Sequence, residues 1–138
     1  MSGGFEVLVD SSAFVGWLFP GDVHHEKAAQ TFQGLAESRS RLVATSFVIA
    51  ETATVLSFRK GQPLAIKFLD HIDRSKIPVI HMDERLQAAA LETFKAQTVK
   101  GTSVVDCANV VIIRRFGIPQ IFSFDEVYAK SFGIETAQ

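Results

Sequence analysis

Apolar and polar positions follow two different periods along the chain. Short β-branched runs bounded by turn residues predict strands, at 5–10, 41–45, 77–81, 118–124 and, at the sheet edge, 133–136. Apolar residues three and four positions apart predict helices between them, at 11–19, 22–38, 46–61, 62–76, 83–97, 103–117 and 125–132. Because strands alternate with helices, the pattern predicts an α/β fold with a mostly parallel central sheet.

The helix expected at 103–117 is apolar on nearly every side, which predicts a buried position at the centre of the molecule. Three other helices are expected to start at a side chain that accepts a free N–H group of the first turn: Asp22, Ser46 and Asp83. No repeat, low-complexity tract or linker interrupts the chain, so residues 1–138 are expected to form a single domain.

Composition places the chain among globular proteins, with 47% hydrophobic and 21% charged residues in a length of 138. The one cysteine, Cys107, excludes an internal disulfide and is expected to be a small buried side chain in a reducing compartment. The N-terminal stretch MSGGFEVLV lacks the basic start and the apolar length of a signal peptide, and no run approaches a membrane span. These features predict a cytoplasmic protein without membrane contact.

The formal net charge is −1, from 14 basic and 15 acidic residues, so no overall basic field draws the chain to nucleic acid. Any contact with RNA is therefore expected to be local. The candidate basic residues are Arg59, Lys60, Lys100, Arg114, Arg115 and Lys130. Basic pairs at helix ends equally complement the helix dipole, which is the simpler interpretation for each of them.

Glu51 is an acidic side chain on an otherwise apolar helix face. It lies about one turn from Phe47, Val48 and Val55, so it projects from the apolar stripe of its helix. A carboxylate in that position must be paired, protonated or bound to a metal, because burying an isolated charge is costly. A salt bridge to an arginine is the simpler alternative.

Asp106 interrupts the helix that is expected to be buried, and aspartate is a poor residue for a helix interior. Thr102 and Ser103 lie a turn before it and Asn109 a turn after it, so one end of this helix carries a small polar island. With Ser103 as the N-cap, Asp106 is the third helical residue. A capping-box acid is therefore the alternative interpretation.

Asp10 and Asp125 each follow a predicted strand and precede a predicted helix. Ligands bind at the carboxyl ends of strands in parallel sheets, although an ordinary N-cap would explain either residue alone. Carboxylates that meet at one sheet edge repel one another unless a divalent cation neutralises them, and all-oxygen ligands favour Mg²⁺ or Mn²⁺. Such a site suits hydrolysis of a nucleic-acid phosphodiester, with Asp10 or Asp106 as general base.

Three segments carry these acids in order: VLVDSSAFVGWL, TSFVIAET and TSVVDCANVVIIRRFGIPQIFSFDEVYAKSFG. Over about residues 7–133 the chain resembles the PIN-domain family of metal-dependent ribonucleases, and its length is similar to that of VapC-type toxins from toxin–antitoxin pairs. The resemblance implies that the catalytic and metal-binding acids are Asp10, Glu51, Asp106 and Asp125.

Polar side chains accompany these acids. The resemblance places Ser11 and Ser12 at the hydroxyl-bearing positions after the first acid, and Ser123 at the serine or threonine two residues before the last. Asn109, from the polar island around Asp106, completes the supporting set. The resemblance further implies a three-layer α/β/α sandwich, one or two Mg²⁺ or Mn²⁺ ions, an RNA substrate, frequent homodimers and a small antitoxin protein as partner.

Three other interpretations keep an α/β domain. A catalytically inactive PIN-fold interaction module would retain the acids without using them. A phosphoaccepting receiver-like domain also places an aspartate and Mg²⁺ at a strand end, but it has adjacent acids after its first strand, where this chain has Ser11 and Ser12. A haloacid-dehalogenase-type phosphatase needs a second aspartate where Ser12 stands.

Overall fold

The computed structural model describes residues 4–138, which form a sheet of five parallel strands in the order β3-β2-β1-β4-β5. The strands are β1 (Val7–Val9), β2 (Leu42–Thr45), β3 (Val79–Ile80), β4 (Gln120–Phe122) and β5 (Glu135–Thr136). Residues 1–3, part of the stretch for which no signal peptide is expected, lie outside the described residues. This strand order differs from the 2-1-3-4-5 order of receiver domains, which excludes that alternative.

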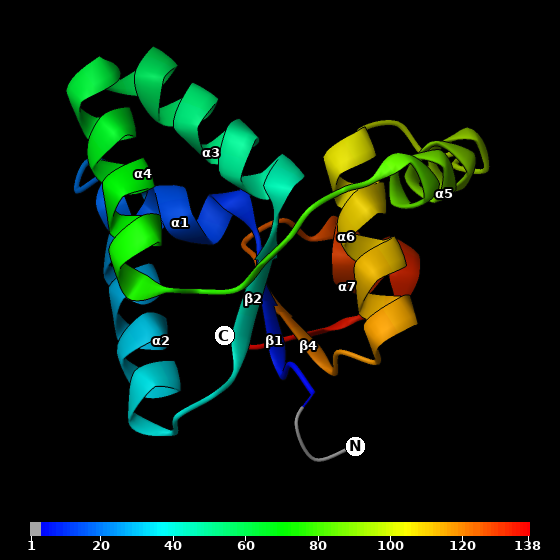
Figure 1. Ribbon diagram of the computed structural model, residues 1–138, viewed down its shortest axis with the longest axis horizontal. Helices are drawn as coiled ribbons and strands as arrows, with labels where there is room; N and C mark the ends of the chain where they lie inside the picture. The colour runs from blue at the N-terminus through cyan, green and yellow to red at the C-terminus, as the bar shows by residue number, and fades with distance from the viewer. Residues whose placement is uncertain (1–3) are drawn as a thin grey trace.

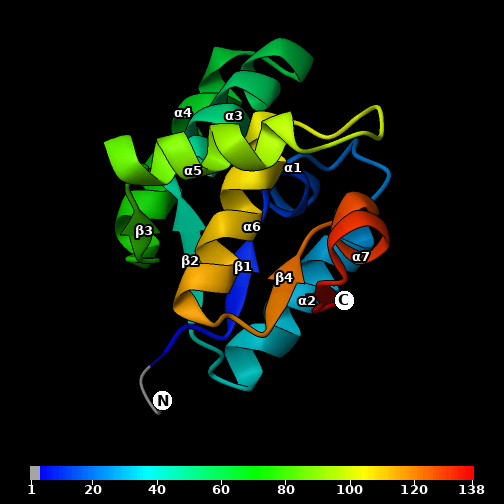
Figure 2. The ribbon, with the colours of Figure 1, turned by 90° about the vertical axis from the view of Figure 1, so that its right-hand side faces the viewer.

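Helices cover both faces of the sheet, which confirms the three-layer α/β/α arrangement (Figures 1 and 2). On one face lie α1 (Ser11–Leu18), α2 (His25–Glu37), α3 (Ser46–Arg59) and α4 (Gln62–Ser75). On the other face lie α5 (Glu84–Lys95), α6 (Val104–Phe116) and α7 (Val127–Phe132). Within residues 4–138, no helix is long and apolar enough to span a lipid bilayer.

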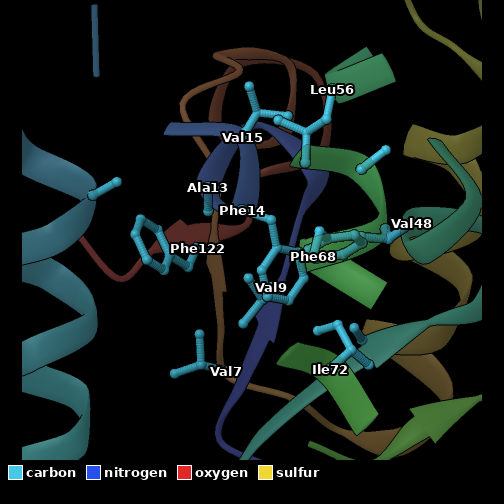
Figure 3. Close-up of a cluster of buried hydrophobic side chains, with 13 residues drawn as sticks. Val7, Val9, Ala13, Phe14, Val15, Val48, Leu56, Phe68, Ile72 and Phe122 are labelled. Atoms are coloured by element: carbon cyan, nitrogen blue, oxygen red, sulfur yellow. The ribbon is translucent and has the colours of Figure 1, made fainter. Parts of the chain in front are cut away.

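Aromatic side chains lie at the centre of the core between the sheet and helices α1 to α4 (Figure 3). Phe14, Phe68 and Phe122 are fully buried there, and the ring centroids of Phe14 and Phe68 lie 5.3 Å apart. Val7 and Val9 of β1 belong to the same cluster, because residues two apart along a strand share a face. The central strand is thus packed against the helices that precede and follow β2.

The helix α6 fills the core on the opposite face of the sheet. Its residues from Asp106 to Ile113 are all buried, which confirms the prediction of a central buried helix. Leu8 of β1 turns to this face and belongs to one cluster with Ile112 and Ile121. Cys107 is buried and forms no disulfide, as expected.

Strand β1 is the point at which the order of the sheet reverses, because β2 and β3 lie on one side of it and β4 and β5 on the other. Ligands in open α/β sheets bind at the carboxyl ends of the strands beside such a reversal. Asp10 follows β1 directly, and its N–H donates to the Phe122 carbonyl of β4 at 2.9 Å. Ser123, which follows β4, therefore lies beside Asp10 at this edge.

The predicted start of the second helix at Asp22 is wrong. Helix α2 begins at His25, because residues 20–24 form a turn. In this turn the Asp22 carboxylate accepts the N–H of His24 at 3.0 Å and pairs with Arg59 at 2.6 Å. The acid therefore ties the turn to the end of α3 instead of capping a helix.

The predicted cap of the third helix is displaced by one residue. The side chain of Thr45 caps α3 by accepting the N–H of Val48 at 3.1 Å. Ser46 instead accepts the N–H of Met82 at 2.9 Å, so it links α3 to the segment after β3. At α5 the prediction is confirmed, since Asp83 is the N-cap.

Candidate active site

Asp10 is buried at the carboxyl end of β1, with 3% of its surface exposed. Its Oδ2 accepts the Ser123 hydroxyl at 2.7 Å, and its Oδ1 accepts the Asn109 amide at 3.1 Å. Although Asp10 precedes α1, its side chain makes no N-cap hydrogen bond to that helix. The structure therefore does not support the helix-cap alternative, and distant parts of the chain hold this carboxylate.

The hydroxyl groups of Ser12 and Ser123 form a chain of hydrogen bonds that ends on Asp10, and the direction of each bond can be assigned. Ser123 has one hydroxyl proton, and the bond to Asp10 uses it. Because Ser12 Oγ lies 3.2 Å from Ser123 Oγ, Ser12 is the donor in that pair. Ser12 Oγ also accepts the N–H of Phe124 at 2.9 Å, and Ser123 Oγ accepts the N–H of Asp125 at 3.1 Å. These bonds join the start of α1 to the segment after β4.

Asp106 is both a capping residue and a buried site residue. It forms a capping box with Ser103 at the start of α6: the Ser103 hydroxyl accepts the N–H of Asp106 at 3.0 Å, and Asp106 Oδ2 accepts the N–H of Ser103 at 2.9 Å. The capping-box interpretation is therefore correct. It leaves Oδ1 free for another donor, and Oδ1 accepts the hydroxyl of Tyr128 at 3.0 Å. Asp106 itself is only 7% exposed.

We expect Ser103→Ala to lower the free energy of unfolding by about 1 kcal/mol, because the variant loses the N-cap side chain of α6. The position of Asp106 should change much less, since the N–H of residue 103 still reaches its carboxylate. Chemical unfolding measures the loss, with the exposed Ser38→Ala as matched control, for which we expect a change within about 0.5 kcal/mol. Equal losses in the two variants would argue against the capping role.

Tyr128 and Asn109 connect Asp106 to Asp10, and both side chains are fully buried. Asn109 Nδ2 donates to Asp10 Oδ1 at 3.1 Å and to Tyr128 Oη at 2.9 Å, while Tyr128 Oη donates to Asp106 Oδ1 at 3.0 Å. The amide nitrogen has two hydrogens, so each bond has its own proton. We call these four side chains, Asp10, Asp106, Asn109 and Tyr128, the buried polar network.

Glu51 reaches the same region from α3. It is half-buried, and its Oε2 accepts the hydroxyl of Ser11 at 2.6 Å. Within residues 4–138 no lysine or arginine forms an ion pair with Glu51, so the structure does not support the salt-bridge alternative. Because Ser11 follows Asp10 directly, this bond brings the Glu51 carboxylate near Asp10, and its charge contributes to raising the pKa of Asp10.

Asp125 lies at the rim and is exposed. Its Oδ1 accepts the N–H of Val127 at 3.0 Å, as in an ordinary turn before a helix such as α7. No hydrogen bond joins its carboxylate to the described side chains of the buried polar network. Its backbone N–H donates to Ser123, the side chain that holds Asp10, and its charge contributes to raising the pKa of Asp106.

Burial dominates the electrostatics of the site. It raises the pKa of Asp10 from 3.8 to about 6, against the lowering effect of hydrogen bonds from the Ser123 hydroxyl and the Ser11 backbone N–H, and the charges of Asp106 and Glu51 raise it further. Burial is also the main cause of a raised pKa at Asp106. The pKa of the Tyr128 phenol is raised far above its usual range by burial and by both aspartates, so its hydroxyl remains a proton donor.

The donor set suits a hard divalent cation. It consists of carboxylate oxygens whose mutual repulsion a cation would relieve. Within the described part of the chain, no three His, Cys, Asp or Glu side chains already enclose a common cation position. Mg²⁺ is usually held by one or two carboxylates together with several waters, so Asp10 and Asp106, with Glu51 nearby, fit a partly hydrated ion.

The surface beside Glu51 is mostly apolar. A shallow cavity of about 370 Å³ adjoins Glu51, and its other lining residues are Phe47, Ala50, Thr54, Val55 and Val105.

Two of the candidate basic residues have local partners, since Arg59 pairs with Asp22 and Lys130 with Glu126. Both also lie in the last turn of their helices, α3 and α7, where a positive charge complements the helix dipole, so the structure favours the simpler interpretation for them.

Tyr128 is the site residue that sequence reasoning missed. Its neighbours in the network, Asp106 and Asn109, come from another helix, so no local pattern marks it. The one available signal is composition, because the chain has 12 phenylalanines and a single tyrosine. A phenol that occurs once in the chain, three residues after Asp125, is the signal that could have marked it.

Comparisons with known proteins point to one family. A VapC ribonuclease from Archaeoglobus fulgidus is 29% identical over 125 residues, which cover 88% of this chain and 78% of that protein. The crystal structure of Mycobacterium tuberculosis VapC20, described as a toxin that cleaves the sarcin–ricin loop, matches with a TM-score of 0.81 at 24% identity, covering 92% of this chain and 95% of that one. The latter match establishes the shared fold. Since the family model described as the PIN domain matches residues 7–131, the chain belongs to the PIN-domain family.

Proposed function

We propose that this protein is a divalent-metal-dependent endoribonuclease whose acidic residues are Asp10, Glu51, Asp106 and Asp125. The observation that carries the proposal is the pair of buried aspartates, Asp10 and Asp106, whose pKa values are raised at the point where the sheet order reverses. Buried carboxylates that repel one another are costly and are typical of functional sites. Membership of the PIN-domain family and the similarity to a VapC ribonuclease support RNA as the substrate.

In this mechanism the chain orients its carboxylates and receives a proton. When bound, Mg²⁺ or Mn²⁺ supplies stabilisation of negative charge on the phosphodiester and lowers the pKa of water. As water attacks phosphorus and the bond to the leaving oxygen breaks, the proton of the water passes to a carboxylate. Asp10 is suited to receive it, because burial raises its pKa to about 6, nearer to neutral than the ordinary value for an aspartate.

The supporting residues keep the acids in place. Ser11 donates to Glu51, while Ser123 and Asn109 donate to Asp10. Ser12 acts through Ser123, to which it donates. We propose that these side chains orient ligands of the cation and do not react themselves.

The relatives support a role as the toxin of a toxin–antitoxin pair. Both the similar ribonuclease and the similar structure are VapC proteins, so we propose a small antitoxin protein as partner, a homodimeric assembly and action in the cytoplasm. The whole of residues 1–138 would then serve as one nuclease domain. Because VapC20 is described as cleaving the sarcin–ricin loop, a hairpin of that loop is the first RNA to test.

The test is an incubation of the purified protein with end-labelled RNAs: the sarcin–ricin-loop hairpin, a transfer RNA and a messenger RNA fragment. We expect internal cuts with Mg²⁺ or Mn²⁺, none in EDTA, and recovery when the ion is added back. Cutting that persists in EDTA would reject the metal dependence. Intact RNA in every ion would reject the nuclease and favour the inactive interaction module.

A further inference from the structure

We propose that Tyr128 and Asn109 are positioning residues that hold Asp10 and Asp106 ready for a divalent cation. This inference rests on the proposed metal dependence and adds two residues to it. Neither residue offers a carboxylate to an ion, and both act through the acids they contact. Their hydrogen bonds join carboxylates from two ends of the chain, 96 positions apart by the numbering of Asp10 and Asp106.

The directions of the hydrogen bonds carry the inference. One amide nitrogen donates both to Asp10 Oδ1 and to Tyr128 Oη, and the phenol passes its own proton on to Asp106 Oδ1. Both carboxylates are therefore tied to one rigid unit, an amide and a ring that are fully buried. A change in the position of either side chain moves both acids.

Packing alone does not explain these side chains. A phenylalanine would fill the space of Tyr128 without a hydroxyl that has to be desolvated, and the chain uses phenylalanine 12 times elsewhere. Within the described residues, the buried Oδ1 of Asn109 has no hydrogen-bond partner. An amide that leaves its acceptor unsatisfied while both N–H groups face acceptors is placed for donation, which a purely apolar core would not require.

The network also leaves room for a cation. The oxygens of Asp106 accept one hydrogen bond each, from Tyr128 at Oδ1 and from the Ser103 N–H at Oδ2. A carboxylate oxygen has two lone-pair directions, so each retains one for an ion or its water. Hydrogen bonds of this kind orient metal ligands, and their loss typically lowers metal affinity about 10- to 100-fold.

The test is calorimetric titration of the metal-free full chain with Mn²⁺. For Tyr128→Phe we expect a dissociation constant for Mn²⁺ raised about 10-fold or more, with an unchanged circular dichroism spectrum. The matched control is Thr52→Val, which removes another fully buried hydroxyl that bonds only within α3, to the Val48 carbonyl at 2.7 Å. We expect the control to bind Mn²⁺ within about 2-fold of the unmodified protein.

A second variant protects the test against a folding defect. Asn109→Leu keeps the approximate shape of the side chain and removes both N–H donors. The two substitutions break the same chain of hydrogen bonds between Asp10 and Asp106. The double variant should therefore lose no more Mn²⁺ affinity than the more severe single variant. Unchanged Mn²⁺ affinity in folded Tyr128→Phe would overturn the inference even if RNA is cut. Tight Mn²⁺ binding that needs Tyr128, in a protein that cuts no RNA, would uphold it while the proposed function fails.

Discussion

Replacing Asp106 with asparagine is expected to lower metal-dependent RNA cleavage by more than about 100-fold, beyond the loss typical for a residue that only orients a metal ligand. The physical reason is the removal of one buried negative charge from the acidic pair that the cation would join. Asparagine keeps the shape of the side chain and one acceptor oxygen for the Ser103 N–H, so the start of α6 should persist. Cleavage of end-labelled RNA measures the effect.

The matched control is Asp83→Asn. Asp83 also lies at a helix start, where it accepts the N–H of Leu86 at 2.9 Å, but it is exposed at the start of α5 and has no bond to the buried polar network. The control should cut RNA like the unmodified protein. If folded Asp106→Asn retained cleavage within a few-fold of the control, Asp106 would have no catalytic role.

The metal-free protein is expected to lose about 3 kcal/mol of unfolding free energy as the pH rises from about 4 to above 6, because of Asp10. Its pKa is 3.8 when solvated and about 6 in the folded state, and each pKa unit corresponds to about 1.4 kcal/mol. In this window the folded protein keeps the proton that the unfolded chain has released, so the folded state is favoured by acid. Above about pH 6 both states are ionised and the loss is complete.

Urea unfolding in EDTA at several pH values measures this effect, and Asp10→Asn isolates it by removing the titrating group. Other groups titrate nearby: burial lowers the pKa of His71, which opposes the trend near pH 6, while the raised pKa of Asp106 adds to it. The lowered pKa of Asp22 affects the free energy of unfolding only below about pH 4. An identical pH dependence in the variant would show that Asp10 is not held in the unfavourable environment described above.

The same linkage predicts how Mn²⁺ binding depends on pH. A carboxylate must be deprotonated to bind a metal, so the affinity should weaken as the pH falls below about 6, the pKa of Asp10. Calorimetry at pH 7.5 and pH 5 compares the two states directly. Affinity that stays constant over this range would mean that the ion binds without displacing the proton of Asp10.

Much of the architecture follows from local patterns in the sequence. Strands and helices could be predicted because the spacing of apolar residues is set by near neighbours in the sequence. Asp10 and Asp106 stood out because each places a charge at the end of, or within, an apolar run. The cap of α3 differed by one residue because Thr45 and Ser46 can both act as caps, and Ser46 instead accepts the N–H of Met82, 36 residues away. Asp22 was misjudged because its partner, Arg59, lies 37 residues away.

The candidate site was less predictable than the fold for the same reason. The residue pattern singled out the four candidate acids and the family resemblance grouped them, but the donors that hold the buried pair come from distant positions. Asn109 lies 99 residues from Asp10, and Tyr128 lies 22 residues from Asp106. A single sequence contains no signal for such pairs. It also could not separate the buried aspartates from Asp125, which shares the strand-end position of Asp10 but is exposed.

The most direct measurement of the central claim is an anomalous X-ray diffraction map from crystals of the full chain soaked with Mn²⁺. We predict one or two peaks at the carboxyl ends of β1 and β4, with a peak about 2–2.5 Å from carboxylate oxygens of Asp10 and Asp106. The Tyr128 hydroxyl should still donate to Asp106 in that structure. Peaks elsewhere, or no peak at an ion concentration that supports RNA cleavage, would contradict a metal site built on these two aspartates.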